Sequence, residues 1–210
     1  MKAHERVYTR PFILIGLANL FTVSSFGSFY LFPLFVTNRG GSKADIGIMM
    51  GVFALSAVLC RPWISEMVDR IGRKRSYTLG CTIMTVLPLF YLLFQGQIHE
   101  FYFALIIARL FHGVGLAICF TSVFTYVADI VPGGRMNEGI GMFGVTGLAG
   151  LAVGPVIAEM IIDYFGFRAF FVSGSFLAGL GLVTQLPLPE SHPHFSGSSE
   201  ASFFPSCSNE

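Results

Sequence analysis

Charged side chains are scarce in this sequence of 210 residues. Lys, Arg, Asp and Glu make up 12% of it and hydrophobic residues 53%, whereas soluble domains carry about 25% charged residues. The composition excludes a disordered chain and argues against an ordinary soluble domain. Basic residues outnumber acidic ones by only 13 to 12. No excess positive charge is available to neutralise phosphates, so we expect no nucleic-acid partner.

Cysteine is also rare. The four cysteines, at positions 60, 81, 119 and 207, form no closely spaced pair. Three of them lie in apolar runs, where cysteine packs as a small hydrophobic residue. The spacing predicts neither a disulfide framework nor a zinc site. We therefore expect no metal and no cofactor.

Long hydrophobic runs dominate what is present. A hydrocarbon core of about 30 Å takes about 20 helical residues to cross. Six runs are long enough, over residues 11–36, 46–65, 76–98, 101–128, 139–158 and 169–189. Because helices satisfy their own backbone groups in lipid, we predict an all-α integral membrane protein with a six-helix bundle over residues 11–189. Residues 1–10 precede it, and the serine-rich residues 190–210 are predicted to be a disordered tail.

The distribution of Lys and Arg predicts an orientation. With the N-terminus inside, the inner segments carry eight Lys or Arg and the outer segments carry three, while Arg61 and Arg109 fall within spans. Cytoplasmic loops are enriched in positive charge. The bias places both termini in the cytoplasm, and we expect the protein in the cell (plasma or inner) membrane.

The sequence contains a weak internal repeat. A shift of 94 residues superimposes the loop after the second span on the loop after the fifth, with Asp69 on Asp163, Gly72 on Gly166 and Lys74 on Arg168. Since three spans are an odd number, the second triplet is inverted relative to the first. A 3+3 inverted repeat is the unit from which many secondary transporters are built.

The loop after the second span carries Asp69, Arg70, Gly72, Arg73 and Lys74. A plain positive-inside loop accounts for the basic residues, but not for an aspartate and a glycine at fixed spacing. The carboxylate can sit at a positive helix N-terminus, and the arginines can pair with carboxylates on a neighbouring bundle. We interpret the loop as a cytoplasmic gating element that latches one closed state.

The fourth span contains Arg109 and, three residues later on the same face, His112. An arginine within a span costs about 2.5–3.5 kcal/mol on insertion scales, so we expect Arg109 to face the bundle interior or a wet cavity. The alternative is that its side chain snorkels to the membrane surface. His112 is the weaker candidate for a proton carrier.

Two further patterns lie in the fifth and first spans. Glycines recur along one side of the fifth span and end in a Gly-Pro pair, a pattern that close helix packing also explains. The residues singled out there are Gly141, Gly150, Gly154 and Pro155. The first span has polar and aromatic side chains at helical spacing, which we interpret as a substrate-facing stripe, with helix packing as the alternative. They are Asn19, Thr22, Phe26 and Tyr30.

Together these motifs resemble the major facilitator superfamily. The loop after the second span is similar to the family's Gly-x-x-x-Asp-(Arg/Lys)-x-Gly-(Arg/Lys)-(Arg/Lys) motif, with Ser65 at its first glycine. The stretch from Arg109 is similar to the family's fourth-span motif, with His112 at the glutamine position. The fifth-span glycines resemble the antiporter motif of its drug-efflux branch without its final Gly-Gly. Asp129 and Pro189-Glu190-Ser191 lie in stretches that are only weakly similar to other motifs of the family.

The resemblance implies the N-terminal six-helix half of a twelve-helix transporter. It implies H⁺-coupled export of a small organic solute by alternating access, with Arg109 and His112 as proton-coupling candidates. The expected partners are the solute, the lipid bilayer, and a second copy or a separately encoded C-terminal half. The alternative is a truncated or frame-shifted, non-transporting membrane fragment. An intramembrane serine protease is disfavoured because Ser173-Gly174-Ser175 lacks the required preceding glycine, so no enzymatic activity is predicted.

Overall fold

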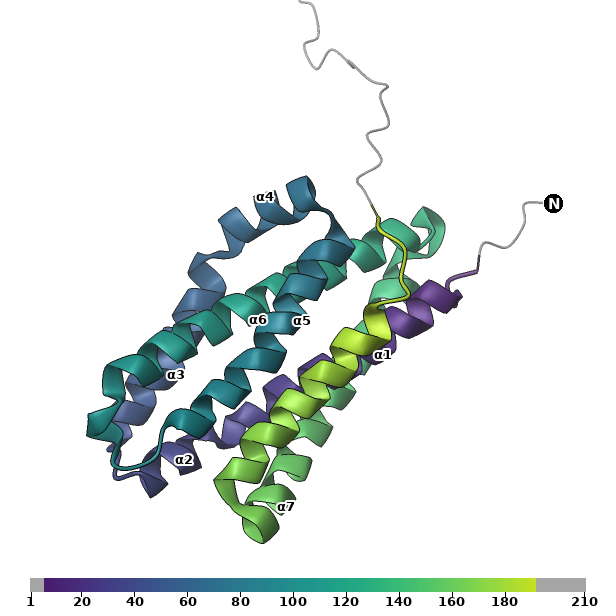
Figure 1. Cartoon of the computed structure of the whole chain (residues 1–210). Helices are drawn as coiled ribbons and strands as arrows, with labels where there is room; N and C mark the ends of the chain where they lie inside the picture. The colour runs from purple at the N-terminus through teal and green to yellow at the C-terminus, as the bar shows by residue number, and fades with distance from the viewer. Residues whose placement is uncertain (1–5, 192–210) are drawn as a thin grey trace, which may run out of the picture.

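The computed structural model describes residues 6–191, and every regular element in that range is helical (Figure 1). In chain order these are α1 (Arg10–Ser28), η1 (Phe29–Leu31), α2 (Phe32–Asn38), α3 (Lys43–Leu59), α4 (Arg61–Ile71), α5 (Arg73–Phe90), η2 (Tyr91–Leu93), η3 (Ile98–Glu100), α6 (Tyr102–Ile130), η4 (Gly133–Arg135) and α7 (Met136–Gln185). The prediction of an all-α fold is confirmed over these residues. The predicted tail beyond residue 191 lies outside them.

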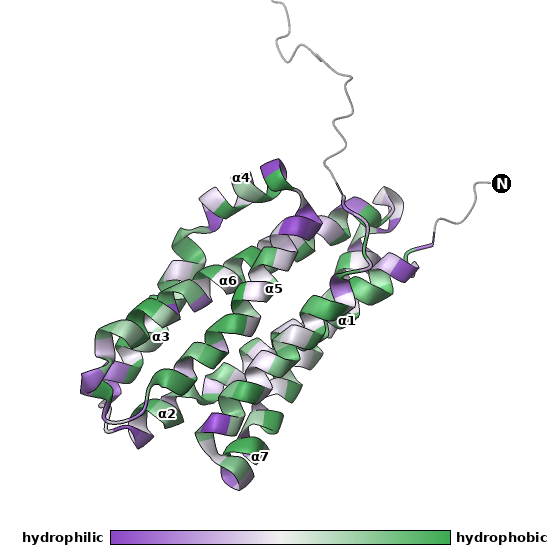
Figure 2. Ribbon diagram, viewed as in Figure 1, coloured by the Kyte–Doolittle hydropathy of each residue, from purple (hydrophilic) through white to green (hydrophobic). Residues whose placement is uncertain are grey.

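Several of these helices are long and apolar enough to cross a membrane. Within residues 6–191 they are the segments Arg10–Asn38, Arg73–Leu93, Tyr102–Ile130 and Gly133–Gln185, and a fifth span forms if the bent pair α3 and α4 counts as one. Figure 2 shows hydrophobic residues along the helices and hydrophilic residues gathered toward the two ends of the bundle. The chain is therefore an integral membrane protein with four to five apolar spans in its described part.

The local sequence explains where two helices begin. The Thr9 hydroxyl accepts a hydrogen bond from the Phe12 amide (3.4 Å) at the start of α1, and Pro11 occupies the first turn, where its missing N–H is not needed. At the start of α3, Ser42 and Asp45 form a capping box in which each side chain accepts from the other's backbone amide.

The second predicted span is bent, which corrects the uninterrupted run expected over residues 46–65. The axes of α3 and α4 meet at 49°, with Cys60 between them. Pro62 explains the break, because its ring and its missing N–H prevent the ladder of α3 from continuing. Arg61 therefore lies exposed in the first turn of α4, directly after the bend.

The break expected over Asp163–Arg168 is also much shorter in the structure. It is confined to Gly166, whose φ of 77° and ψ of −177° depart from helical values inside α7. The positive φ is accessible to glycine without steric cost, so the chain turns there with almost no loop. Figure 1 shows the two parts of α7, in green and yellow-green, folded back beside α1.

The helices pack in two groups. One consists of α1 and both parts of α7, and the other of α6 with α3, α4 and α5; α5 joins the two groups, because it also packs against α7 (Figure 1). The first described residues, the α4–α5 junction and the segment after α7 lie at one end of the bundle, since the Lys74 amide bonds Glu190 and Val7 belongs to the same apolar cluster as Leu188. Arg39 and Arg168 lie at the other end, where they bond Gly96 and Gln95.

Candidate functional site

The loop motif forms a cluster of ion pairs around Arg73. The Arg73 side chain is only 5% exposed, and its guanidinium contacts the Asp69 carboxylate at 2.8 Å and the Asp129 carboxylate at 3.1 Å. Asp129 lies near the end of α6, so Arg73 has both carboxylate partners within this bundle, and pairing of the motif's arginines with a neighbouring bundle stays a prediction. The pair joins the α4–α5 junction to α6 within one chain.

Glu190 completes this cluster from the segment after α7. Its carboxylate accepts hydrogen bonds from the backbone amides of Lys74 (2.8 Å) and Arg75 (3.1 Å), so it caps the positive N-terminus of α5. Gly72 precedes that helix with a φ of +107°, and a Cβ there would lie 2.7 Å from Glu190 Oε1. The backbone conformation thus favours glycine at this position, and a side chain there would also displace the capping carboxylate.

Within the described residues, the side chains of the motif's other basic residues, Arg70 and Lys74, form no ion pair with the carboxylates of that cluster. Arg70 is exposed and pairs with Glu66 one turn earlier on α4, and the contact that Lys74 makes with Glu190 is through its backbone. The sequence pattern identified Arg73 but could not identify its partners. Asp129 and Glu190 had been noted only as members of weaker motifs.

Two of the fifth-span glycines pack α7 against α1. A Cβ on Gly150 would lie 2.7 Å from the Leu20 carbonyl oxygen, and one on Gly154 would collide with the Ser24 carbonyl oxygen. Around Gly141 there is open space, and Pro155 lies within the same helix. The structure therefore gives Gly150 and Gly154 a packing role that Gly141 does not share.

Arg109 lies in the wall of a cavity between α1, α3 and α6. The cavity has a volume of about 320 Å³, and it is lined by Phe26, Phe29, Tyr30, Met50, Phe53, Ala54 and Arg109. The Arg109 side chain does not snorkel to the surface, because the residue is only 1% exposed. Its guanidinium carbon is 4.0 Å from the centre of the Phe32 ring and 4.8 Å from that of Phe53, which are cation–π distances.

His112 is fully buried one turn further along α6. Its Nδ1 is 3.3 Å from the Tyr91 hydroxyl, and its ring meets the Phe29 ring edge to face at 4.6 Å. Its Nε2 has no hydrogen-bond partner within residues 6–191. The structure thus brings Arg109 and His112 together in one aromatic environment, as their spacing predicts.

The first-span stripe is divided by the structure. Phe26 and Tyr30 line the Arg109 cavity, but Asn19 is buried and donates to the Thr146 hydroxyl at 3.0 Å, while the Thr22 hydroxyl is 3.3 Å from that of Tyr77. Asn19 and Thr22 therefore serve helix packing and do not face the cavity, which corrects the single substrate-facing stripe. The aromatic cage around Arg109 was missed, because a sequence with 23 phenylalanines does not reveal which rings surround the arginine.

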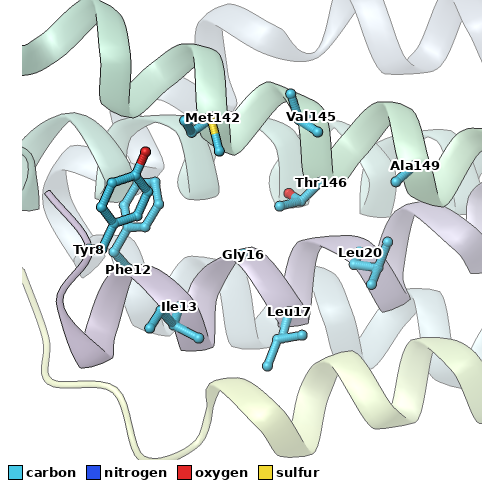
Figure 3. A pocket seen from close by; sticks show the side chains of 10 residues that line it. All are labelled: Tyr8, Phe12, Ile13, Gly16, Leu17, Leu20, Met142, Val145, Thr146 and Ala149. Atoms are coloured by element: carbon cyan, nitrogen blue, oxygen red, sulfur yellow. The ribbon is translucent and has the colours of Figure 1, made fainter.

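A second cavity, of about 340 Å³, lies between α1 and the first part of α7 (Figure 3). Its walls are almost wholly apolar and include Ile13, Leu17 and Val145. The hydroxyl of Thr146, which also lines it, is already hydrogen-bonded to Asn19 and to the Phe143 carbonyl. Nothing in this cavity resembles the charged centre at Arg109. In the described part of the chain, no three potential metal-ligating side chains gather either.

The fold and the site define a helical membrane protein with a buried cation beside a cavity that opens at the surface of the described bundle. Residues 12–208 match the family model described as Major Facilitator Superfamily. The chain belongs to the major facilitator superfamily, whose members are transporters.

Several relatives are named for drug resistance or export. Multidrug resistance protein 2 of Bacillus subtilis is 28% identical over 204 residues, covering 92% of this chain and 49% of that protein. The staphylopine export protein of Staphylococcus aureus is 27% identical over 149 residues, covering 70% and 36%. The quinolone resistance protein NorA of Staphylococcus aureus is 21% identical over 143 residues, covering 68% and 36%. The chain thus spans half or less of the length of these relatives.

Proposed function

We propose that this chain forms a six-helix lobe of an H⁺-coupled secondary transporter that exports a small organic solute by alternating access. Both termini face the cytoplasm of the cell membrane, and a second copy of this chain completes the central cavity. The observation that carries the proposal is the buried Arg109 beside a cavity in a chain of this family. Such a charge within a membrane marks a substrate or proton pathway.

The six-span arrangement requires that α7 cross the membrane twice. At 1.5 Å per residue its 50 residues span about 75 Å, more than twice a hydrocarbon core of about 30 Å. A reversal at Gly166 leaves residues 136–165 and 167–185, and each of these is long enough for one crossing. The packing of α1 with α7, and of α6 with α3, α4 and α5, supports a 3+3 inverted repeat, because each first helix packs against the other triplet.

The orientation and the direction of transport rest on separate observations. Arg70, Arg73, Lys74 and Arg75 lie at the bundle end where the described chain begins and ends, which the positive-inside rule places in the cytoplasm. Export is supported by the similarity to the staphylopine export protein, and coupling to H⁺ by the proximity of Arg109 to His112. The Arg73 cluster is the cytoplasmic gating element of this proposal.

The test is proton-coupled flux by the purified chain in liposomes that contain a pH-sensitive dye, with a fluoroquinolone as the first probe. We expect a drug-dependent proton movement that Arg109→Ala abolishes without loss of membrane insertion. Arg61→Ala, at the exposed start of α4, serves as the matched control and keeps the flux. Full proton-coupled flux in Arg109→Ala would refute the assigned role.

A second candidate function is that of an assembly partner without transport activity of its own. It is favoured by the coverage of half or less of the relatives' length. The same liposomes distinguish the two, if they are reconstituted once with this chain alone and once together with the unmatched half of the Bacillus subtilis relative. Flux only in the second preparation supports the assembly partner, and flux in the first supports the transporter.

A further inference from the structure

Arg109 is a buried charge that no carboxylate within residues 6–191 matches. None of the ion pairs formed within residues 6–191 includes it. Its Nε and Nη1 atoms also lack a hydrogen-bond partner there, although a guanidinium presents five N–H donors. A buried charge without a counter-charge is strongly unfavourable. The site is therefore incomplete as it stands.

The neighbours of the guanidinium compensate it only in part. The rings of Phe32 and Phe53 provide cation–π contacts, and Nη2 lies 3.0 Å from the Met50 thioether, which is a weak acceptor. The Tyr91 hydroxyl also interacts with it electrostatically. All four neighbours are uncharged. What the site lacks is an anion with acceptor oxygens.

The adjoining cavity indicates what the rest of such a ligand looks like. Its volume of about 320 Å³ lies at the lower end of the range for small-molecule sites, about 300–1,000 Å³. Its lining contains no Asp or Glu. The Phe26 and Phe53 rings are stacked at 5.9 Å with an interplanar angle of 11°, and Tyr30 is 49% exposed beside them. An aromatic ring can pack onto such a surface.

We propose that this cavity binds a small aromatic carboxylate, with the carboxylate on Arg109 and the ring beside Phe26 and Tyr30. The proposal rests on the transport function above and deepens it by assigning the solute a negative charge. Met50 controls access to Arg109, because its thioether contacts the Nη2 atom of the guanidinium. Its unbranched side chain can move aside readily. The incoming carboxylate replaces this weak contact with charge-assisted, bidentate hydrogen bonds.

The experiment is calorimetric titration of the full chain in lipid nanodiscs with salicylate, with empty nanodiscs as background. Salicylamide and benzylamine serve as the neutral and cationic counterparts of similar size. We expect saturable binding of salicylate alone. Arg109→Gln weakens it about tenfold or more, since charged hydrogen bonds are lost. Arg61→Gln, at an exposed arginine outside the cavity, leaves binding unchanged.

Met50→Ala keeps the test decisive if Arg109→Gln fails to fold, because removal of the covering thioether is expected to strengthen salicylate binding several-fold. The proposal is overturned if salicylamide or benzylamine binds as well as salicylate, if neither variant changes the affinity, or if chloride alone fills the site. Salicylate binding without any proton flux contradicts the transport proposal and leaves this one standing. Flux of a cationic solute without salicylate binding supports the transport proposal and overturns the carboxylate site.

Discussion

Replacement of Gly154 by alanine tests whether α1 and α7 pack backbone to backbone. The added Cβ would collide with the Ser24 carbonyl oxygen, and it would lie 2.9 Å from the Ser28 amide nitrogen and 3.1 Å from the Gly27 carbonyl carbon. These are backbone atoms, which cannot rotate away as the end of a side chain can. The only relief is for α1 to move away from α7, which also strains the bond from Ser28 Oγ to the Gly154 carbonyl (3.2 Å).

The magnitude follows from two opposing effects. Overpacking in a well-packed interior costs about 1–3 kcal/mol, while alanine favours a helix over glycine by about 1 kcal/mol. Gly141, in the same helix, has open space where its Cβ would lie, so Gly141→Ala keeps the favourable effect alone. Because both variants share the helix preference, we expect them to differ by the overpacking cost alone, about 1–3 kcal/mol in the free energy of unfolding. For a chain of this size, each kcal/mol shifts the Tm by about 2–4 °C.

Thermal unfolding in one detergent, followed by circular dichroism, measures this difference directly. Gly154→Ala is expected to melt below the wild type, and Gly141→Ala at or above it. The two substitutions add the same methyl group to the same helix, so general effects of alanine cancel between them. If both variants melt at the same temperature, the close approach of α1 and α7 at Gly154 does not exist in solution.

Two further predictions concern the cluster at the start of α5. Arg73→Ala is expected to lower the free energy of unfolding by about 1.5–3 kcal/mol, because it removes charged hydrogen bonds from a side chain only 5% exposed, whereas the exposed Arg70→Ala changes it by less than about 0.5 kcal/mol. Thermal unfolding of both compares them, and equal losses would contradict the distinction. Glu190→Ala is expected to speed hydrogen exchange at the Lys74 and Arg75 amides, which donate to this carboxylate; mass spectrometry measures the exchange, and unchanged rates would show that the cap does not persist.

Much of the fold could be predicted from the sequence, because lipid leaves few options for a long apolar run. Helices were expected in all six runs, and the burial of Arg109 followed from the cost of a charge in hydrocarbon. The bend at Cys60 was missed although Pro62 signals it. The length of the apolar run was given more weight there than the proline, which is a helix breaker in its own right.

The contacts between helices were not predictable in the same way. Helical periodicity says which residues share a face, but not which helix that face meets. Asn19 and Phe26 share a face of α1 in sequence terms, yet Asn19 bonds Thr146 on α7 while Phe26 stacks on Phe53 of α3. Partners so distant along the chain are fixed by tertiary packing. Residues predicted to form one surface of α1 are therefore divided between the interface with α7 and the Arg109 cavity.

The two arginine sites differ in a way that bears on function. Arg73 and Arg109 are both almost fully buried, yet Arg73 contacts two carboxylates while Arg109 contacts none in the described chain. The carboxylate of Asp129 lies on α6, the helix that carries Arg109, about 30 Å away at 1.5 Å per residue. One helix thus carries a satisfied charge site at one end and an unsatisfied one near the other. Unsatisfied buried polar groups in native proteins occur mainly at functional sites, so the group that completes Arg109 is to be sought beyond the described residues, as a bound ligand would be.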